Sequence, residues 1–263
     1  LIFWDNKSTD FSAKIFKSFN DKRFKYYYSD KHTSLYEARN LAIEKTNSEY
    51  IAFLDTDDLW INNKLEIQMK CFDNEDVGLV FSNYWIMNKK LKNKKIYTHK
   101  KLPNGAIYEK LLDVYSVGIL TVIMRKKFFL KLEKKFDGRF SIIGDFDLFL
   151  RLSKICIFQS IQIPLAFYRL HGSNLSIVNN KTEINEMGQW LEENKSNLNI
   201  KQFNKIKKVL FNQKFINYKI EREYSKCINV LFNSGVNILS VKNFIILFTP
   251  VFLLKNFLWY YQD

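Results

Sequence analysis

The first 58 residues alternate between short apolar runs and amphipathic segments, and this alternation restricts the possible folds more than any other feature of the chain. Residues 1–4, 24–28 and 50–54 are apolar runs of strand length. Between them, apolar residues recur at helical spacing from Phe11 to Phe19, and Ser34 and Glu37 have the spacing of a capping box at the start of a second helix. Strands that alternate with helices at this pitch predict an α/β fold with a mostly parallel, twisted sheet flanked by helices.

The remainder of the chain continues this pattern and then changes in composition. The predicted elements are a helix over 64–72, a strand over 77–85, a basic hairpin over 89–101, a helix over 107–114, a strand over 119–124, a helix from residue 144 and a strand over 165–170. Beyond about Ser176 the sequence is rich in Asn and Lys with helical periodicity. We therefore predict a catalytic domain over 1–178 and a helical C-terminal region over 179–263.

The charge and the apolar C-terminus predict a membrane surface as one partner. The chain carries 41 basic and 27 acidic residues, a formal net charge of +14, which favours polyanions. It has no zinc finger, RNP-type motif or recognition-helix pattern, so we expect no nucleic-acid binding. Residues 241–261 are strongly apolar but interrupted by Pro250 and Lys255, which favours an interfacial helix pair over a bilayer span. We expect peripheral association with the anionic inner face of the cell membrane.

The cysteines indicate a reducing compartment. Cys71, Cys156 and Cys227 are scattered without CxxC spacing, so neither a structural zinc site nor a disulfide framework is expected. A cytoplasmic location follows from this pattern.

A cluster of carboxylates follows the third predicted strand. In open α/β sheets, ligands bind at the carboxyl ends of the strands, where Asp55, Asp57 and Asp58 stand. Like charges this close repel one another unless a cation or hydrogen-bond donors share the site, and carboxylate oxygens suit Mg²⁺ or Mn²⁺. Taken alone, the tetrapeptide Asp55-Thr56-Asp57-Asp58 is equally well explained as a solvated turn that caps the next helix.

Four motifs together resemble those of the family 2 glycosyltransferases. They are Asp5-Asn6-x-Ser8-Thr9-Asp10, Ala38-Arg39-Asn40, Phe53-Leu54-Asp55-x-Asp57-Asp58 and Asp145-x-Asp147-Leu148-x-Leu150-Arg151, in the order and spacing of that family. Each motif alone is weak, whereas four in register over residues 1–175 are specific. The resemblance implies a GT-A fold, inversion at the anomeric carbon, a UDP- or GDP-sugar donor and a divalent metal ion, Mn²⁺ or Mg²⁺.

The resemblance assigns two residues to the nucleotide. Asp5 matches the aspartate that receives the base, and its carboxylate can accept a hydrogen bond from a uracil or guanine N–H. Arg39 matches an arginine near the base or diphosphate, where a planar guanidinium suits anionic groups. The alternatives are that Asp5 caps the following helix and that Arg39 lies on an ordinary helix surface.

The resemblance also implies a metal site. Asp55 and Asp57 match the DXD pair of the family, with Asp57 the first choice of metal ligand, Asp55 placed at the ribose and Asp58 able to exchange roles with either. His171 matches a histidine that completes the metal site or contacts the diphosphate in some members. The alternative for His171 is a structural role.

Asp145 matches the general base that takes the proton of the acceptor hydroxyl. The alternative is an N-cap of the helix that begins there. At the position before Asp145 the sequence departs from the family, because Gly144 stands where a glutamate is usual. We expect this change to affect acceptor contacts or positioning more than the base itself.

The predicted function is the transfer of a sugar to a hydroxyl of a glycan or lipid-linked acceptor in surface polysaccharide or glycoconjugate synthesis. The chain begins inside a predicted strand, and the strand and nucleotide-binding loop that normally open the family are absent, so we expect a truncated N-terminus. A catalytically silent GT-A-like module that binds glycan or lipid is the alternative. A nucleotidyltransferase is disfavoured because no glycine-rich phosphate loop is present near the start.

Overall fold

The computed structural model of the chain describes residues 1–88, 94–172, 174, 180–233 and 249. The chain divides into two compact units, Leu1–Leu170 and His171–Asp263. The predicted boundary between residues 178 and 179 falls in a stretch outside the described residues.

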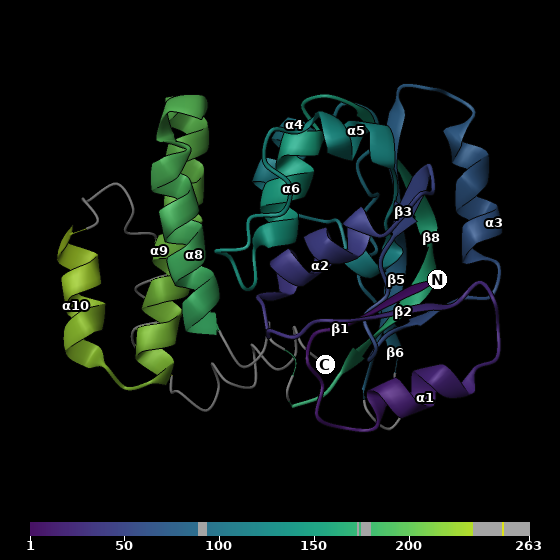
Figure 1. The fold of residues 1–263 in the computed structure, drawn as a ribbon. Coiled ribbons are helices and arrows are strands. Elements are labelled where there is room, and N and C mark those ends of the chain that lie inside the picture. The colour runs from purple at the N-terminus through teal and green to yellow at the C-terminus, as the bar shows by residue number, and fades with distance from the viewer. Residues whose placement is uncertain (89–93, 173, 175–179, 234–248, 250–263) are drawn as a thin grey trace. The chain divides into compact units, whose positions relative to one another are not determined.

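The first unit contains a six-stranded sheet, a separate pair of parallel strands, and helices on both sides (Figure 1). Its strands are β1 (Ile2–Asp5), β2 (Lys25–Tyr28), β3 (Tyr50–Ala52), β4 (Leu59–Trp60), β5 (Val77–Asn88), β6 (Lys94–Ile96), β7 (Ile123–Arg125) and β8 (Ile157–Leu170). Its α-helices are α1 (Ser12–Ser18), α2 (Leu35–Glu44), α3 (Lys64–Met69), α4 (Tyr108–Asp113), α5 (Lys126–Lys131) and α6 (Gly144–Leu152). Short 3-10 turns follow α3 (Lys70–Phe72) and precede β7 (Ile119–Thr121).

The strand directions differ from the mostly parallel arrangement predicted from the sequence. The main sheet has the order β3-β7-β5-β8-β4, with β6 added beside β5. Only β5–β8 and β1–β2 pair in parallel, and the other assigned pairs are antiparallel. The sheet is therefore mixed, because periodicity along the chain indicates where strands occur but not which distant strand each one meets.

Local sequence signals explain where several elements begin. The Ser34 side chain accepts a hydrogen bond from the Glu37 backbone N–H at 3.3 Å, which caps α2 as its spacing predicts. The predicted basic hairpin over 89–101 is represented by β6, which pairs with residues 85–87 of β5, while residues 89–93 lie outside the described part.

The core of the first unit lies around β5, β7 and β8. Leu79, Val80, Phe81 and Phe158 are completely buried there, and burying each such side chain contributes about 1.5–3 kcal/mol. The Arg125 guanidinium, 2% exposed, donates to the Val77 and Phe72 carbonyls and joins β7 to β5. This rigid centre holds the loops at the sheet edge where the candidate residues lie.

The described part of the second unit is helical. It contains α8 (Asn180–Glu193), a 3-10 turn (Lys195–Asn197), α9 (Ile200–Ile220) and α10 (Tyr224–Asn233). Asn199 and Gln202 form a reciprocal capping box at the start of α9. Phe215 of α9 and Cys227 of α10 are completely buried against each other. The apolar segment 241–261 lies outside the described residues except for Thr249.

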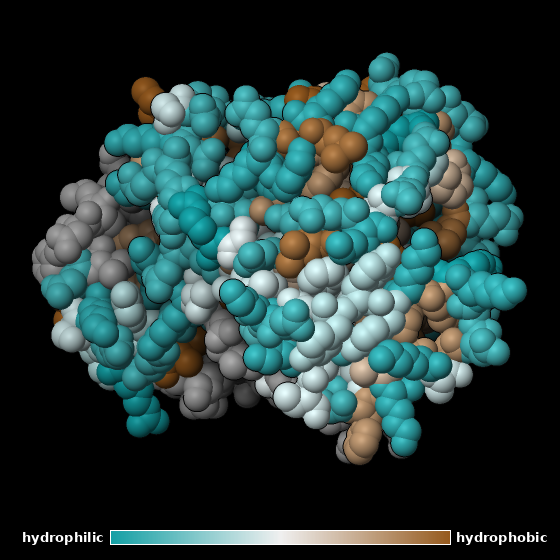
Figure 2. Space-filling model, viewed as in Figure 1, coloured by the Kyte–Doolittle hydropathy of each residue, from teal (hydrophilic) through white to brown (hydrophobic). Residues whose placement is uncertain are grey.

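The surface shown in Figure 2 is mostly hydrophilic, with apolar residues in small groups between charged ones. Among the exposed apolar side chains, Phe11, Ile15 and Phe19 recur along α1 and its ends. In the part of the chain that the structure describes, no helix has the length and hydropathy needed to cross a bilayer.

Candidate functional site

The loop after β1 holds Asp5 in a fixed, buried position. Asp5 is 2% exposed, and its Oδ1 accepts from the Ser8 backbone N–H at 2.7 Å while its Oδ2 accepts from the Tyr26 hydroxyl at 2.6 Å. Burial acts to raise the pKa of Asp5, but the hydrogen bonds from Tyr26 and Ser8 outweigh it and lower that pKa. Asp5 does not cap α1, whose N-cap is Phe11.

The same loop has an unusual backbone conformation. Lys7 has φ +66°, in the left-handed region that non-glycine residues seldom adopt. Asn6 ties the loop to the segment before α2, because its side chain donates to the Thr33 carbonyl at 2.9 Å and accepts from the Thr33 N–H at 3.2 Å. The contacts of Asn6 and Ser8 compensate for the strain at Lys7 and shape the loop around Asp5.

Arg39 and Asp55 form an ion pair between α2 and the loop after β3. The Arg39 Nη2 atom lies 2.8 Å and 3.0 Å from the two carboxylate oxygens of Asp55. Arg39 is 8% exposed, so the interpretation of an ordinary surface arginine is wrong. Its guanidinium also lies 5.3 Å from the Tyr36 ring centre and 5.9 Å from that of Phe53, which adds cation–π attraction.

The neighbouring residue of this motif has a structural role. The Asn40 side chain donates to the Phe136 carbonyl at 2.9 Å and accepts from the Phe136 N–H at 3.1 Å. The loop that precedes α6 is thereby fastened to α2.

Asp55, Asp57 and Asp58 lie on one turn that β8 holds in place. The Asp58 N–H donates to the Asp55 carbonyl at 3.0 Å, and β4, which follows directly, pairs with β8. Arg169 of β8 then contacts the turn three times: its N–H donates to Asp58 Oδ1 at 3.0 Å, and its guanidinium donates to the carbonyls of Asp57 and Thr56. The turn is therefore built into the sheet rather than being an ordinary solvated turn.

Asp58 is the buried carboxylate of this turn. It is 6% exposed, and burial, reinforced by the negative charges of Asp57 and Asp55, raises its pKa to about 7. A cation at this turn would relieve that repulsion. Within the described residues, however, no three His, Cys, Asp or Glu side chains gather closely enough to hold a metal ion.

Asp145 lies in the first turn of α6, and two tyrosine hydroxyls are aimed at it. The Tyr36 oxygen lies 3.0 Å from Asp145 Oδ1, and the Tyr115 hydroxyl donates to Oδ2 at 2.9 Å. Burial raises the pKa of Asp145, and the Arg39 charge and these hydroxyls only partly offset the rise. The N-cap of α6 is Ile143, so Asp145 is not the cap.

The charges of Asp145, the predicted base, and of Asp58, a predicted metal ligand, both act on Tyr84. Burial raises the pKa of Tyr84 well above its usual value, and the negative charges of both Asp145 and Asp58 add to that rise. Tyr84 stacks on Tyr97 with ring centres 4.6 Å apart. The fold thus brings together Arg39, Asp55, Asp58 and Asp145, which are far apart in the sequence.

The other candidates are placed as follows. Asp147, two residues after Asp145 on α6, pairs with Arg151 at 2.6 Å and is 8% exposed. His171 is the first residue of the second unit, where its backbone N–H donates to the Asn174 side chain. Its role as a metal ligand stays a prediction.

Sequence analysis did not identify three residues that contact the candidate site. Tyr36 precedes Arg39 by three residues on α2 and so shares its helix face, which is a usable signal. Tyr115 and Arg169 had no comparable signal, because they reach Asp145 and the Asp55–Asp58 turn from elements distant in the sequence.

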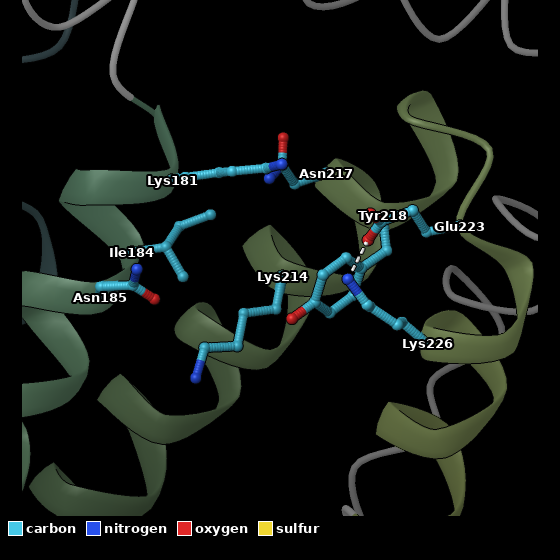
Figure 3. A pocket seen from close by; sticks show the side chains of 8 residues that line it. All are labelled: Lys181, Ile184, Asn185, Lys214, Asn217, Tyr218, Glu223 and Lys226. Atoms are coloured by element: carbon cyan, nitrogen blue, oxygen red, sulfur yellow. Dashed lines mark ion pairs between the residues drawn. The ribbon is translucent and has the colours of Figure 1, made fainter.

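A separate pocket lies among the helices of the second unit (Figure 3). Lys181 pairs with Glu221 at 2.8 Å and Lys226 with Glu223 at 2.9 Å, so these lysines are neutralised by glutamates of the same unit. The residues that line this pocket are Lys181, Ile184, Asn185, Lys214, Asn217, Tyr218, Glu223 and Lys226.

Comparison with solved structures identifies the fold. The chain matches the crystal structure of Staphylococcus aureus TarS residues 1–349 in complex with UDP-GlcNAc with a TM-score of 0.60 at 15% identity, over 93% of this chain and 74% of that chain. The match with full TarS has a TM-score of 0.62 and covers 44% of that chain. The fold is therefore the GT-A glycosyltransferase fold, as predicted.

Sequence comparison gives the family. The family model Glycosyl transferase family 2 matches residues 1–151, more than half of the chain. The chain therefore belongs to the family 2 glycosyltransferases, which confirms the family predicted from the four motifs. Members of this family are inverting enzymes that use nucleotide-sugar donors.

Two curated relatives illustrate the match. The chain is 30% identical over 181 residues to the Escherichia coli UDP-Glc:alpha-D-GlcNAc-diphosphoundecaprenol beta-1,3-glucosyltransferase WfgD, covering 69% of this chain and 68% of WfgD. It is 29% identical to the putative teichuronic acid biosynthesis glycosyltransferase TuaG of Bacillus subtilis, covering 48% of this chain and 50% of TuaG. The chain thus spans about half to two thirds of these two proteins.

Proposed function

We propose that this chain transfers a sugar from a UDP-sugar, with inversion, to a hydroxyl of a lipid-linked sugar acceptor, with Asp145 as the general base. The observation that carries the proposal is the Asp145 carboxyl, held by Tyr36 and Tyr115 in the same site as the Arg39–Asp55 pair. A UDP-sugar and a diphosphoundecaprenol-linked acceptor are supported by the names of WfgD and of WfaP, another Escherichia coli relative.

In the proposed reaction, Asp145 takes the proton of the acceptor hydroxyl. The acceptor oxygen forms a bond to the anomeric carbon while the bond from that carbon to the diphosphate oxygen breaks. The nucleoside diphosphate leaves with the electron pair of that bond. A raised pKa makes Asp145 a stronger proton acceptor than an ordinary aspartate, provided that the pH keeps it ionised.

The donor is proposed to bind along the edge where the Asp5 loop, Arg39 and the Asp55–Asp58 turn are found. Asp5 is assigned to the base, Arg39 to the base or diphosphate, and Asp55 to the ribose. Arg39 is already oriented by Asp55 and by two aromatic rings, so little side-chain entropy remains to be lost when the nucleotide binds.

The donor set at the turn fits a hard divalent cation, Mn²⁺ or Mg²⁺. Asp57 and Asp58 supply carboxylate oxygens, and the raised pKa of Asp58 reflects negative charge that a cation would offset. We assign the ion to Asp57 and Asp58. Such an ion, when bound, supplies positive charge that stabilises the departing diphosphate.

Peripheral association with the cytoplasmic face of the membrane is part of the proposal. It is supported by the net charge of +14 and by the apolar segment 241–261. Flotation with vesicles containing anionic lipid should carry the chain upward, and removal of residues 241–263 should reduce that fraction. Equal flotation of both forms would overturn the role of this segment.

The activity is tested by incubating the purified chain with UDP-glucose and a synthetic GlcNAc-diphospholipid in the presence of Mn²⁺. The expected result is UDP release that depends on the acceptor, with a β-linked product identified by NMR. Binding of UDP without transfer to any of a panel of lipid-linked sugars would favour the silent module instead.

A further inference from the structure

The first turn of α6 has no side chain at Gly144, and the Tyr36 ring occupies the space. A Cβ atom added to Gly144 would lie 2.5–2.6 Å from the Cγ, Cδ2 and Cε2 atoms of Tyr36. Real Cβ atoms do not approach other atoms so closely, so a side chain at residue 144 requires the Tyr36 ring to move. Glycine at this position is therefore what lets Tyr36 lie against the backbone of α6 beside Asp145.

The Tyr36 ring is held firmly in that place. It is 3% exposed and stacks on Phe136, with ring centres 5.4 Å apart and planes inclined by 25°. Phe136 is itself fastened to α2 by two backbone hydrogen bonds with the Asn40 side chain, one donated and one accepted by Asn40. The Arg39 guanidinium also lies 5.3 Å from the Tyr36 ring centre.

The Tyr36 hydroxyl has two acceptors but only one proton. Its oxygen lies 2.6 Å from the Ile142 carbonyl oxygen and 3.0 Å from Asp145 Oδ1. When Asp145 is ionised, the hydroxyl can donate to it. When Asp145 is protonated, the carboxyl can donate to the Tyr36 oxygen, while the Tyr36 proton turns to Ile142.

Tyr115 differs from Tyr36 in this respect. Its hydroxyl donates to Asp145 Oδ2 at 2.9 Å, so it stabilises the ionised carboxylate. Arg39, Tyr36 and Tyr115 act on Asp145, and burial, reinforced by the charge of Asp145, in turn raises the pKa of Tyr84.

We propose that Tyr36 is a positioning residue for Asp145, which holds the carboxyl group both before and after it takes the acceptor proton, and that Gly144 makes room for it. The inference rests on the proposed function, because it assigns the proton transfer to Asp145. It also gives a physical meaning to the glycine that replaces the usual glutamate of the family.

The test compares the pH dependence of kcat/KM for Tyr36→Phe and Tyr115→Phe. Tyr36→Phe keeps the ring and its packing but removes the hydroxyl that pairs with Asp145 in both its ionised and its protonated form. We expect the plateau of kcat/KM to fall about tenfold, with the midpoint of its low-pH limb little changed. Tyr115→Phe loses a donor to the ionised form alone, so its low-pH limb should move to higher pH, which the limb of Tyr36→Phe should not do.

Gly144→Ala provides an independent variant that leaves both hydroxyls in the chain. Its Cβ displaces the Tyr36 ring, so the plateau should fall as in Tyr36→Phe. In a Tyr36→Leu background, Gly144→Ala should cost much less than in the parent chain, because the ring that it displaces is gone. Far-UV circular dichroism and UDP affinity should be unchanged in Tyr36→Phe, since the ring that supports Arg39 remains.

The outcomes separate this inference from the proposed function. A parent chain that transfers sugar, together with a Tyr36→Phe profile identical to that of the parent, would overturn the role of Tyr36 alone. The same conclusion follows if Tyr36→Phe moves the low-pH limb as far as Tyr115→Phe does. A parent chain that binds UDP but transfers no sugar would overturn the proposed function, and the inference with it.

Discussion

The turn after β3 and the first turn of α6 both hold carboxylates, but different kinds of partner stabilise the carboxylates at the two places. At the turn, one carboxylate is paired with the Arg39 guanidinium, and Asp58 accepts a backbone hydrogen bond from Arg169. At α6, Asp145 is held by the hydroxyls of Tyr36 and Tyr115. Three acidic side chains within four residues favour a cation, whereas one carboxyl among neutral hydroxyls is suited to exchange a proton.

The largest expected effect is the loss of the proton acceptor. Asp145→Asn keeps the size of the side chain but has a far weaker base, so we expect transfer to fall about 10³-fold while UDP affinity is retained. Steady-state kinetics and calorimetry measure the two quantities.

Asp147→Asn is the matched control on the same helix. It weakens the contact with Arg151 and should lower the free energy of unfolding by about 1–3 kcal/mol, with transfer retained by the folded protein. If Asp147→Asn and Asp145→Asn lower transfer equally, the effect is one of helix stability and Asp145 is not the base.

The next largest effect concerns the cation at the turn. Asp57→Ala should weaken UDP binding in Mn²⁺ about a hundredfold and leave the weaker binding in EDTA nearly unchanged. Calorimetric titration of UDP and GDP under both conditions checks this expectation and also identifies the nucleotide. Equal affinity in Mn²⁺ and EDTA for the parent chain would falsify the metal assignment.

A smaller effect is expected in the pH dependence of stability without metal. The pKa of Asp58 is about 7 in the folded chain and 3.8 for the unperturbed side chain, so the folded state holds more protons between these values. Stability should therefore fall as the pH rises through this window. Asp58→Asn should be near neutral at about pH 4 and should raise the free energy of unfolding by about 2 kcal/mol at about pH 8. Urea unfolding at the two pH values measures this, and a gain that is the same at both would show that the charge of Asp58 is not costly.

The smallest effect is expected on stability, from Lys64, a buried lysine that follows the Asp55–Asp58 turn in the sequence. Lys64 is completely buried, its Nζ has no hydrogen-bond partner in the described part of the chain, and it lies 4.2 Å from the Trp60 ring centre. Burial lowers its pKa to about 7. Lys64→Met should raise the free energy of unfolding by about 1 kcal/mol at pH 7.

The pH dependence distinguishes this gain from a packing effect. Between about 7 and 10.5 the unfolded chain holds more protons on Lys64 than the folded chain, so parental stability rises with pH and the gain from Lys64→Met shrinks. Lys70→Met, which removes an exposed pair with Glu66, should change stability little and serves as the control. A gain that does not depend on pH would mean that folding does not lower the pKa of Lys64.

The sequence alone predicted the family, the first elements of the fold and the candidate site residues. Helical spacing, strand-length apolar runs and the capping spacing of Ser34 and Glu37 are local signals, so β1, α1, β2 and α2 were predicted close to their observed positions. The motifs that indicate a glycosyltransferase are also local, which is why the residue pattern by itself singles out Asp5, Arg39, Asp55, Asp57 and Asp145.

Only the tertiary structure decided strand direction and the surroundings of those residues. β7 runs antiparallel to both β3 and β5, and Arg169 reaches the turn from a strand more than a hundred residues away. Tyr36 meets Asp145 across 109 residues of sequence, and it does so because Gly144 lacks a Cβ. Such contacts depend on which surfaces pack together, and packing is set by the shapes of distant segments rather than by the periodicity of any one of them.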